Sequence, residues 1–146
     1  MSDDILRTLM DRQQIADLCV RYATALDTKD WALLRRCFVD EPVFVHPGGR
    51  LEGWDAILAR TSGALIPLDV TQHLLGNITA EVDGDVASSR CYFQAQHVRH
   101  DTPGGDTYVI AGSYADRLER TADGWRIAER VQAYFWHEGN RAVVSR

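Results

Sequence analysis

The sequence is poor in lysine and contains no cluster of basic residues. Lys29 is its single lysine, and 16 Lys and Arg against 21 Asp and Glu give a formal net charge of −5. Proteins that follow a nucleic-acid backbone need dense positive charge to neutralise its phosphates. We therefore expect no nucleic-acid partner.

Long apolar runs are missing too. No uncharged stretch approaches the roughly 20 apolar residues that a membrane-spanning helix needs. The first residues, Met1-Ser2-Asp3-Asp4, do not resemble the basic beginning of an export signal. We therefore expect no membrane partner and a cytoplasmic location.

Cysteines are few, and the common nucleotide-binding motifs do not occur. Cys19, Cys37 and Cys91 are widely spaced among apolar residues, which favours reduced core thiols over a disulfide framework or a zinc site. The nucleophile elbow, the phosphate-binding glycine loop and the dinucleotide fingerprint are all missing from the sequence. Any chemistry is therefore expected to be proton transfer by side chains, with no metal and no organic cofactor.

What is present is the composition of an ordinary globular protein, with 45% hydrophobic and 25% charged residues in a chain of 146. This length predicts one domain over residues 1–146. Apolar spacing, a capping Asp30 and a stop at Asp40-Glu41-Pro42 predict three helices, over residues 5–26, 31–38 and 54–64. Between the second and the third, short strands are predicted over residues 43–46 and 51–53.

The second half of the sequence has the period of strands. Turn sequences at 83–84, 101–106 and 121–124 separate four long runs that predict strands, over residues 71–82, 86–99, 107–120 and 125–137. Strands of this length need strong twist to stay in one domain. The predicted fold is α+β: a cone-shaped, curved antiparallel sheet wrapped around a helical hairpin and a third helix, with an apolar cavity at one end.

Three ionisable residues are candidates for chemistry. Asp27 follows the buried face of the first helix, and His73 and His97 lie on two strands joined by the 83–84 turn. Counting outward from that turn places Gln96 opposite His73, and a register shift of a residue or two would bring His73 and His97 onto one interior face. The alternatives are a solvated Asp at a helix end and two structural histidines.

The remaining histidines and the aromatic residues are weaker candidates. His97 and His100 mimic a metal-ligand spacing, but residues three apart on a strand point to opposite faces, so no metal site is expected. Core packing is the simplest role for an aromatic residue. We nevertheless expect five side chains to contact a substrate: Tyr22, Trp31, His46, Tyr114 and Tyr134.

Four segments give the chain a resemblance to a known family: Ala23–Trp31, Thr71-Gln72-His73, Gln94–His97 and Asp123–Ile127. In them the sequence resembles the SnoaL-like branch of the nuclear transport factor 2-like superfamily, and within it scytalone dehydratase and hexachlorocyclohexane dehydrochlorinase. The resemblance implies that Asp27 pairs with His73 and that His97 joins them. It also implies a homo-oligomer, commonly a trimer.

The sequence departs from the dehydratase pattern at two tyrosines that would hold a water on the substrate carbonyl. Leu26 stands where one of them is expected, and His46 lies near the position of the other. This departure argues against scytalone itself as the substrate, whereas His97 argues against a plain copy of the dehydrochlorinase.

The favoured function is a cofactor-independent lyase, of the dehydratase or dehydrohalogenase type, acting on a small hydrophobic cyclic substrate. His73, polarised by Asp27, would abstract a proton from carbon, and His97 would assist as an acid or hydrogen-bond donor. One alternative is a non-catalytic binding or assembly module, such as the small subunit of a ring-hydroxylating dioxygenase. Another is an isomerase or cyclase of the ketosteroid or polyketide type, in which a lone Asp is the base.

Overall fold

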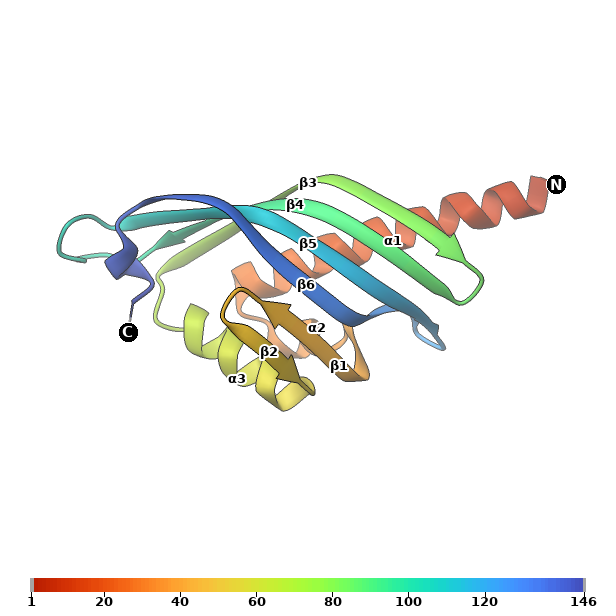
Figure 1. The fold of residues 1–146 in the computed structure, drawn as a ribbon, viewed down its shortest axis with the longest axis horizontal. Coiled ribbons are helices and arrows are strands. Elements are labelled where there is room, and N and C mark those ends of the chain that lie inside the picture. Colours follow the sequence, from red (N-terminus) through yellow and green to blue (C-terminus); the bar gives the residue numbers. More distant parts are fainter. Residues whose placement is uncertain (1, 146) are drawn as a thin grey trace.

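Three helices and a six-stranded sheet make up the chain, and the structure, a computed structural model, describes residues 2–145 (Figure 1). The helices are α1 (Ser2–Thr28), α2 (Trp31–Arg35) and α3 (Trp54–Leu65), and a 3-10 turn covers Arg141–Val143. The strands are β1 (Phe38–His46), β2 (Gly49–Glu52), β3 (Val70–Asp83), β4 (Val86–Val98), β5 (Thr107–Thr121) and β6 (Gly124–Gly139).

The predicted α+β class and the order of the elements are confirmed, with one correction to the sheet. The strands lie in the order β2-β1-β6-β5-β4-β3, and all neighbours are antiparallel except β1 and β6, which pair in parallel. The prediction of a purely antiparallel sheet is therefore wrong at this one junction. After the α1–α2 hairpin the chain enters the sheet in the same direction as β6. Strand β1 therefore pairs with β6 in parallel, with no tight turn between them.

The second helix is shorter than predicted, and the first strand begins earlier. Asp30 caps α2 as expected, because its carboxylate accepts a hydrogen bond from the Leu33 backbone N–H at 3.0 Å. The helix ends at Arg35 and not at Phe38, because the Cys37 carbonyl accepts a hydrogen bond from the Ile127 N–H at 2.8 Å. This bond draws the chain into the sheet beside β6.

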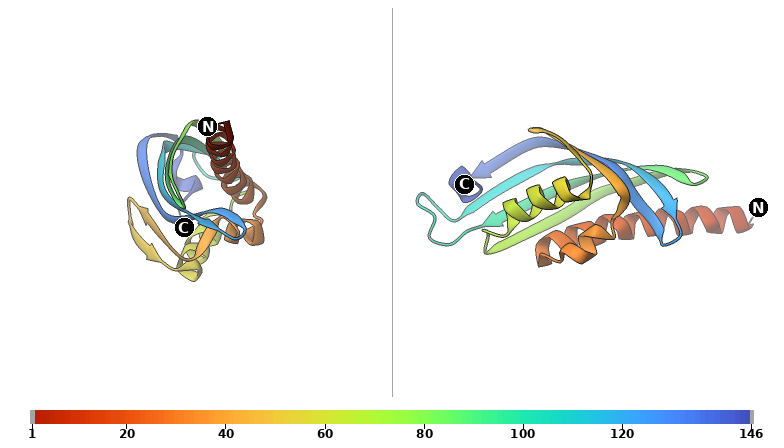
Figure 2. Two further views of the ribbon diagram at one scale, coloured as in Figure 1. Left: turned by 90° about the vertical axis from the view of Figure 1, so that its right-hand side faces the viewer. Right: turned by 90° about the horizontal axis from the view of Figure 1, so that it is seen from below.

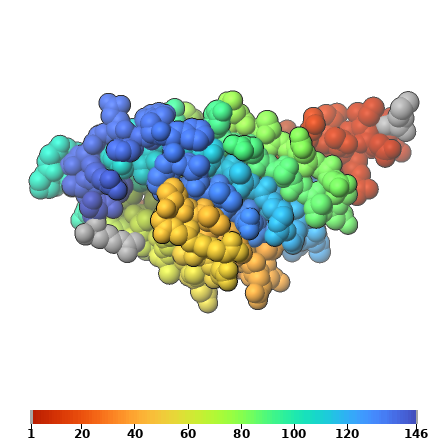
Figure 3. Space-filling view, viewed as in Figure 1, coloured from red at the N-terminus to blue at the C-terminus, as the bar shows by residue number. Residues whose placement is uncertain are grey.

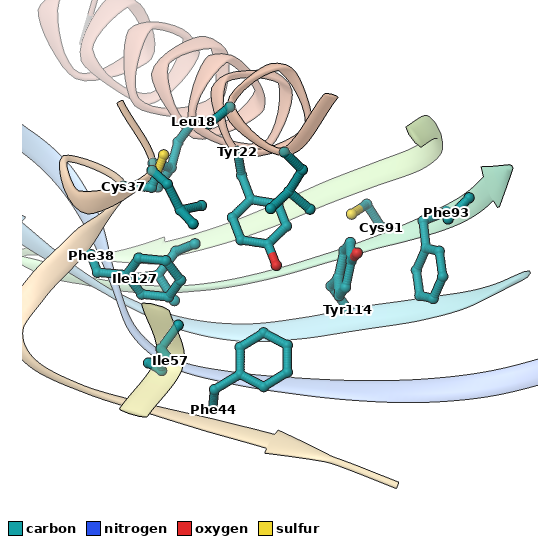
Figure 4. Close-up of a cluster of buried hydrophobic side chains, with 14 of the residues drawn as sticks. Leu18, Tyr22, Cys37, Phe38, Phe44, Ile57, Cys91, Phe93, Tyr114 and Ile127 are labelled. Carbon is teal, nitrogen blue, oxygen red and sulfur yellow. The ribbon is translucent and has the colours of Figure 1, made fainter. Parts of the chain in front are cut away.

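The sheet is strongly curved, and its concave side holds the core. Figure 2 shows α3 lying across the concave face, and α1 runs along β3. Figure 4 shows side chains of α1 pointing toward side chains of the sheet and of α3: Leu18, Tyr22, Phe38, Phe44, Ile57 and Tyr114. The enclosed, apolar interior is the part of the fold that positions the candidate site.

The first turns of α1 extend beyond the sheet, as the space-filling view shows (Figure 3). Their apolar side chains are more than half exposed: Ile5, Leu6, Leu9 and Met10. Among residues 2–145, no helix is both long and apolar enough to cross a membrane.

Candidate active site

Asp27 and His73 form a close pair between the end of α1 and the beginning of β3. The Asp27 Oδ1 atom lies 2.6 Å from the His73 Nδ1 atom, and the carboxylate also accepts the His73 backbone N–H at 2.9 and 3.1 Å. A carboxylate at a helix C-terminus faces the negative end of the helix dipole, and these hydrogen bonds offset that cost. Because Nδ1–H donates to Asp27, the Nε2 atom of a neutral His73 carries the free lone pair.

His97 is buried next to this pair and is held in the same way. Its Nδ1 atom lies 3.0 Å from the Tyr108 carbonyl oxygen, which can only accept, so Nδ1 carries the hydrogen and Nε2 is again the free nitrogen. Burial lowers the pKa of His97 and outweighs the hydrogen bond with the Tyr108 carbonyl, which raises it; the neighbouring His73 also lowers the pKa. His97 is therefore neutral at pH 7.

The hairpin that carries the two histidines is one residue out of the predicted register. Close to the turn, Thr79 pairs with Arg90, as counting from residues 83–84 predicts. Further along, His73 pairs with Ala95 and not with Gln96. The prediction of Gln96 as its partner is therefore wrong by one residue.

A β-bulge at Asn77 causes this shift. Asn77 has a left-handed backbone, with φ of 51°, and the ladder is interrupted between Gly76 and Thr79. Side chains alternate between the faces of a strand, so one extra residue moves His73 to the face that carries His97. Their ring centroids are 6.5 Å apart, with the planes at 71°. The bulge thus brings the two imidazoles together.

A cavity of about 250 Å³ opens on the concave side of the sheet beside His97. Its walls are mostly apolar and include Leu26, Phe44, Leu65, Phe93 and Ile110. Of the residues expected to contact substrate, Tyr22, Tyr114 and Tyr134 line it.

The other predicted site residues lie around the cavity and do not line it. Asp27 and His73 are not among the lining residues, although the His73 ring lies next to that of His97, and the His73 side chain is 7% exposed. Trp31 packs against the core from α2. His46 lies at the β1–β2 turn, where its Nδ1 accepts the Gly48 N–H at 3.0 Å. The structure therefore brings together Asp27, His73 and His97 and places three tyrosines on the cavity wall. Trp31 and His46 lie outside this group.

The sequence that builds this site matches a known family. The profile of the SnoaL-like domain matches residues 7–131. The chain belongs to the SnoaL-like family. Terrestric acid biosynthesis cluster protein E of Penicillium crustosum is 32% identical to it over 144 residues, which cover 94% of this chain and 92% of that protein.

Solved structures place this SnoaL-like chain in the nuclear transport factor 2-like fold, as its sequence predicts. A hexachlorocyclohexane dehydrochlorinase of type 2 superposes with a TM-score of 0.81, at 20% identity over 92% of each chain. A proposed scytalone dehydratase from Novosphingobium aromaticivorans superposes with a TM-score of 0.81, at 21% identity over 97% of this chain and 93% of that one. At these identities the likeness establishes the fold.

Sequence reasoning missed a buried ion pair that supports the cavity of this SnoaL-like protein. The Arg130 guanidinium donates to both Asp116 oxygens at 2.8 and 2.7 Å, and its central carbon lies 4.1 Å from the ring centroids of Tyr22 and Tyr114. Burial raises the pKa of both phenols, so they stay protonated at neutral pH and can donate hydrogen bonds. These two tyrosines are therefore hydrogen-bond donors in the cavity wall, although neither occupies the position that the dehydratase pattern predicts.

Proposed function

We propose that this protein is a cofactor-independent lyase that eliminates water or HX from a small hydrophobic cyclic substrate. The observation that carries the proposal is the Asp27–His73 pair, which leaves the Nε2 atom of a neutral imidazole free beside His97. The dehydrochlorinase and dehydratase among the similar structures support it, as does a relative that is named for a biosynthesis cluster.

In the proposed reaction His73 is the general base. Its Nε2 takes a proton from a substrate carbon, the C–H electrons form a double bond to the neighbouring carbon, and the leaving group departs from that carbon. Asp27 stabilises the imidazolium that results. A departing hydroxide recovers the proton as water, whereas a halide leaves as the anion and the proton passes to solvent.

The geometry changes the part that we assign to His97. Its Nδ1–H is already donated to Tyr108, and burial lowers the pKa of the ring, so neutral His97 can accept a hydrogen bond at Nε2 but not donate one there. We therefore assign the donor role toward the departing group or the enolate to the protonated Tyr22 and Tyr114. His97 would orient a substrate hydroxyl.

The lone-aspartate mechanism fits the site less well. The Asp27 carboxylate already accepts hydrogen bonds from the backbone and the ring of His73. A carboxylate held in this way is better suited to orienting an imidazole than to abstracting a proton from a substrate carbon.

Elimination can be tested directly with a panel of cyclic β-hydroxy ketones and chlorinated cyclohexanes. We expect turnover of at least one member, followed as absorbance of the new conjugated ketone or as released chloride, and unchanged rates after dialysis against EDTA. A rate that depends on added metal would contradict the mechanism. Absence of turnover, together with co-purification of a large iron-sulfur subunit, would favour the assembly-module alternative.

We also propose that the protein is a homo-oligomer, with a trimer favoured, assembled through the convex face of the sheet. That face exposes a group of apolar side chains on β3, β4 and β6: Leu74, Tyr92, Val131, Phe135 and Trp136. Tyr92 and Phe135 pack edge to face at 5.7 Å, and exposed apolar patches of this kind mark interaction surfaces.

Gel filtration with light scattering tests the assembly. We expect a mass of about three times that of the chain and a smaller mass for Phe135→Glu. Leu9→Glu, on the projecting end of α1, is the matched control and should leave the mass unchanged. A wild-type mass of 16.4 kDa at micromolar concentration would contradict the proposal.

A further inference from the structure

Among residues 2–145, Arg60 of α3 is the one formally charged residue that lines the cavity beside His97, His97 itself being neutral. Six other arginines have carboxylate partners: Arg35, Arg50, Arg117, Arg120, Arg126 and Arg130. Within residues 2–145, Arg60 makes no ion pair and donates no side-chain hydrogen bond. Its guanidinium is therefore available to a ligand.

The surroundings of Arg60 strengthen its attraction for an anion. Most cavity walls are apolar, and charges interact more strongly beside such walls than in bulk water. The planar guanidinium matches a carboxylate with two parallel hydrogen bonds, which favours an anionic oxygen group over a halide or a neutral carbonyl. In the part of the chain that the structure describes, no carboxylate lines the cavity to oppose such a ligand.

A second polar group of the cavity also lacks a partner. Gln132 lies directly opposite Tyr114 on the neighbouring strand β6, and its buried side-chain oxygen has no hydrogen-bond partner within residues 2–145. A buried acceptor of this kind costs free energy unless a donor reaches it. The free His97 Nε2 is a further acceptor. The cavity thus offers one cationic donor at Arg60 and unfilled acceptors elsewhere.

We propose that Arg60 determines specificity, so that the cavity selects ring compounds that carry a carboxylate or another anionic oxygen group. A hydroxyl on the same ring would satisfy Gln132 or His97. The inference deepens the proposed lyase function by naming the substrate class, and it rests on that function only for what happens to the ligand after binding.

Binding of two probes of equal shape tests the proposal. Equilibrium dialysis at pH 7.5 would compare 2-naphthoate, which is anionic, with its neutral analogue 2-naphthamide. We expect the wild-type protein to bind the acid at least tenfold more tightly than the amide. Equal affinity for the two probes would overturn the proposal without any variant.

Substitutions of Arg60 then assign the preference to this side chain. Arg60→Met keeps the length and removes the charge, and it should bind both probes equally, whereas Arg60→Lys should keep part of the preference. Arg90→Met removes an exposed charge of β4 outside this cavity and is the matched control. A full preference in Arg60→Met, or a loss in Arg90→Met as large as in Arg60→Met, would overturn the assignment.

Repeating the measurement in Asp27→Asn separates this inference from the lyase proposal. Asp27 does not line the cavity, so the variant should prefer the acid as the wild type does. Loss of the preference in Asp27→Asn would contradict Arg60 as its source. If turnover depends on Asp27 but the wild-type protein does not prefer 2-naphthoate over 2-naphthamide, the lyase proposal stands and only the anion site is refuted.

Discussion

Replacing Asp27 by asparagine is expected to lower kcat/KM for elimination by at least about 10²-fold, and replacing His73 by alanine to lower it at least as much. The carboxylate lies 2.6 Å from the His73 Nδ1 atom, so it fixes the ring with Nε2 free and stabilises the imidazolium that forms during proton abstraction. An asparagine amide can still accept the Nδ1 hydrogen, but it brings no charge. The loss should therefore appear mainly in kcat, with a smaller change in KM.

Initial rates over a range of substrate concentrations separate these two constants. The double variant Asp27→Asn/His73→Ala should be no slower than His73→Ala alone, because residues that act as a unit are not additive. Asp17→Asn is the matched control, because Asp17 lies on the same helix and is exposed. Among the described residues, its carboxylate accepts a hydrogen bond only from Gln13, at 2.9 Å. The rate of Asp17→Asn should equal that of the wild type.

Two outcomes would contradict the dyad. Near wild-type turnover in Asp27→Asn or in His73→Ala would remove that residue from the mechanism. An inactive Asp27→Asn beside an active His73→Ala would indicate a lone aspartate base, as in the ketosteroid and polyketide type of chemistry.

The helical part of the fold could be predicted because its signals are local. Ile15, Leu18, Tyr22 and Leu26 of α1 recur at spacings of three and four, and all four are buried. The end of α2 could not be predicted in this way. It depends on the hydrogen bond between the Cys37 carbonyl and the Ile127 N–H, across 90 residues of sequence.

The candidate site was predictable as a set of residues but not as a geometry. Asp27 stands out because it occupies a position where the helix pattern calls for an apolar residue. The common face of His73 and His97 depends instead on the bulge at Asn77, which counting from the turn does not include. Gly76-Asn77 within a strand is the signal for it, since such pairs mark bulges.

A second β-bulge explains why the ion pair between Asp116 and Arg130 could not be predicted from the sequence. Leu118 pairs with Ile127, but Arg117 pairs with Glu129, so the extra residue Ala128 turns Arg130 inward. Without that residue the strand alternation would place Arg130 on the solvent face. Charged residues in an alternating strand are typical of an exposed face, and the sequence alone therefore gives no reason to bury this arginine.

Replacing Asp116 by alanine is expected to lower the free energy of unfolding by about 3–5 kcal/mol, because it leaves the Arg130 charge buried without a counter-ion. Arg130 is 0% exposed. Burial alone would lower its pKa, but Asp116 outweighs this effect and raises it, so the arginine stays charged. Urea denaturation followed by tryptophan fluorescence measures the loss. Glu119→Ala, which breaks the exposed Arg117–Glu119 pair, should cost at most about 1 kcal/mol.

The double variant Asp116→Leu/Arg130→Met distinguishes the loss of a charge partner from the loss of packing. Within residues 2–145, the Arg130 Nη1 atom has no hydrogen-bond partner, so the native pair does not fully offset the cost of burying its charges. Apolar residues of similar volume should therefore recover most of the stability that Asp116→Ala loses. Because Arg130 lies against both Tyr22 and Tyr114, the same variant should alter ligand affinity even where stability returns. A double variant as unstable as Asp116→Ala would show that stability depends on the packing of the two native side chains and not only on the absence of an unpaired buried charge.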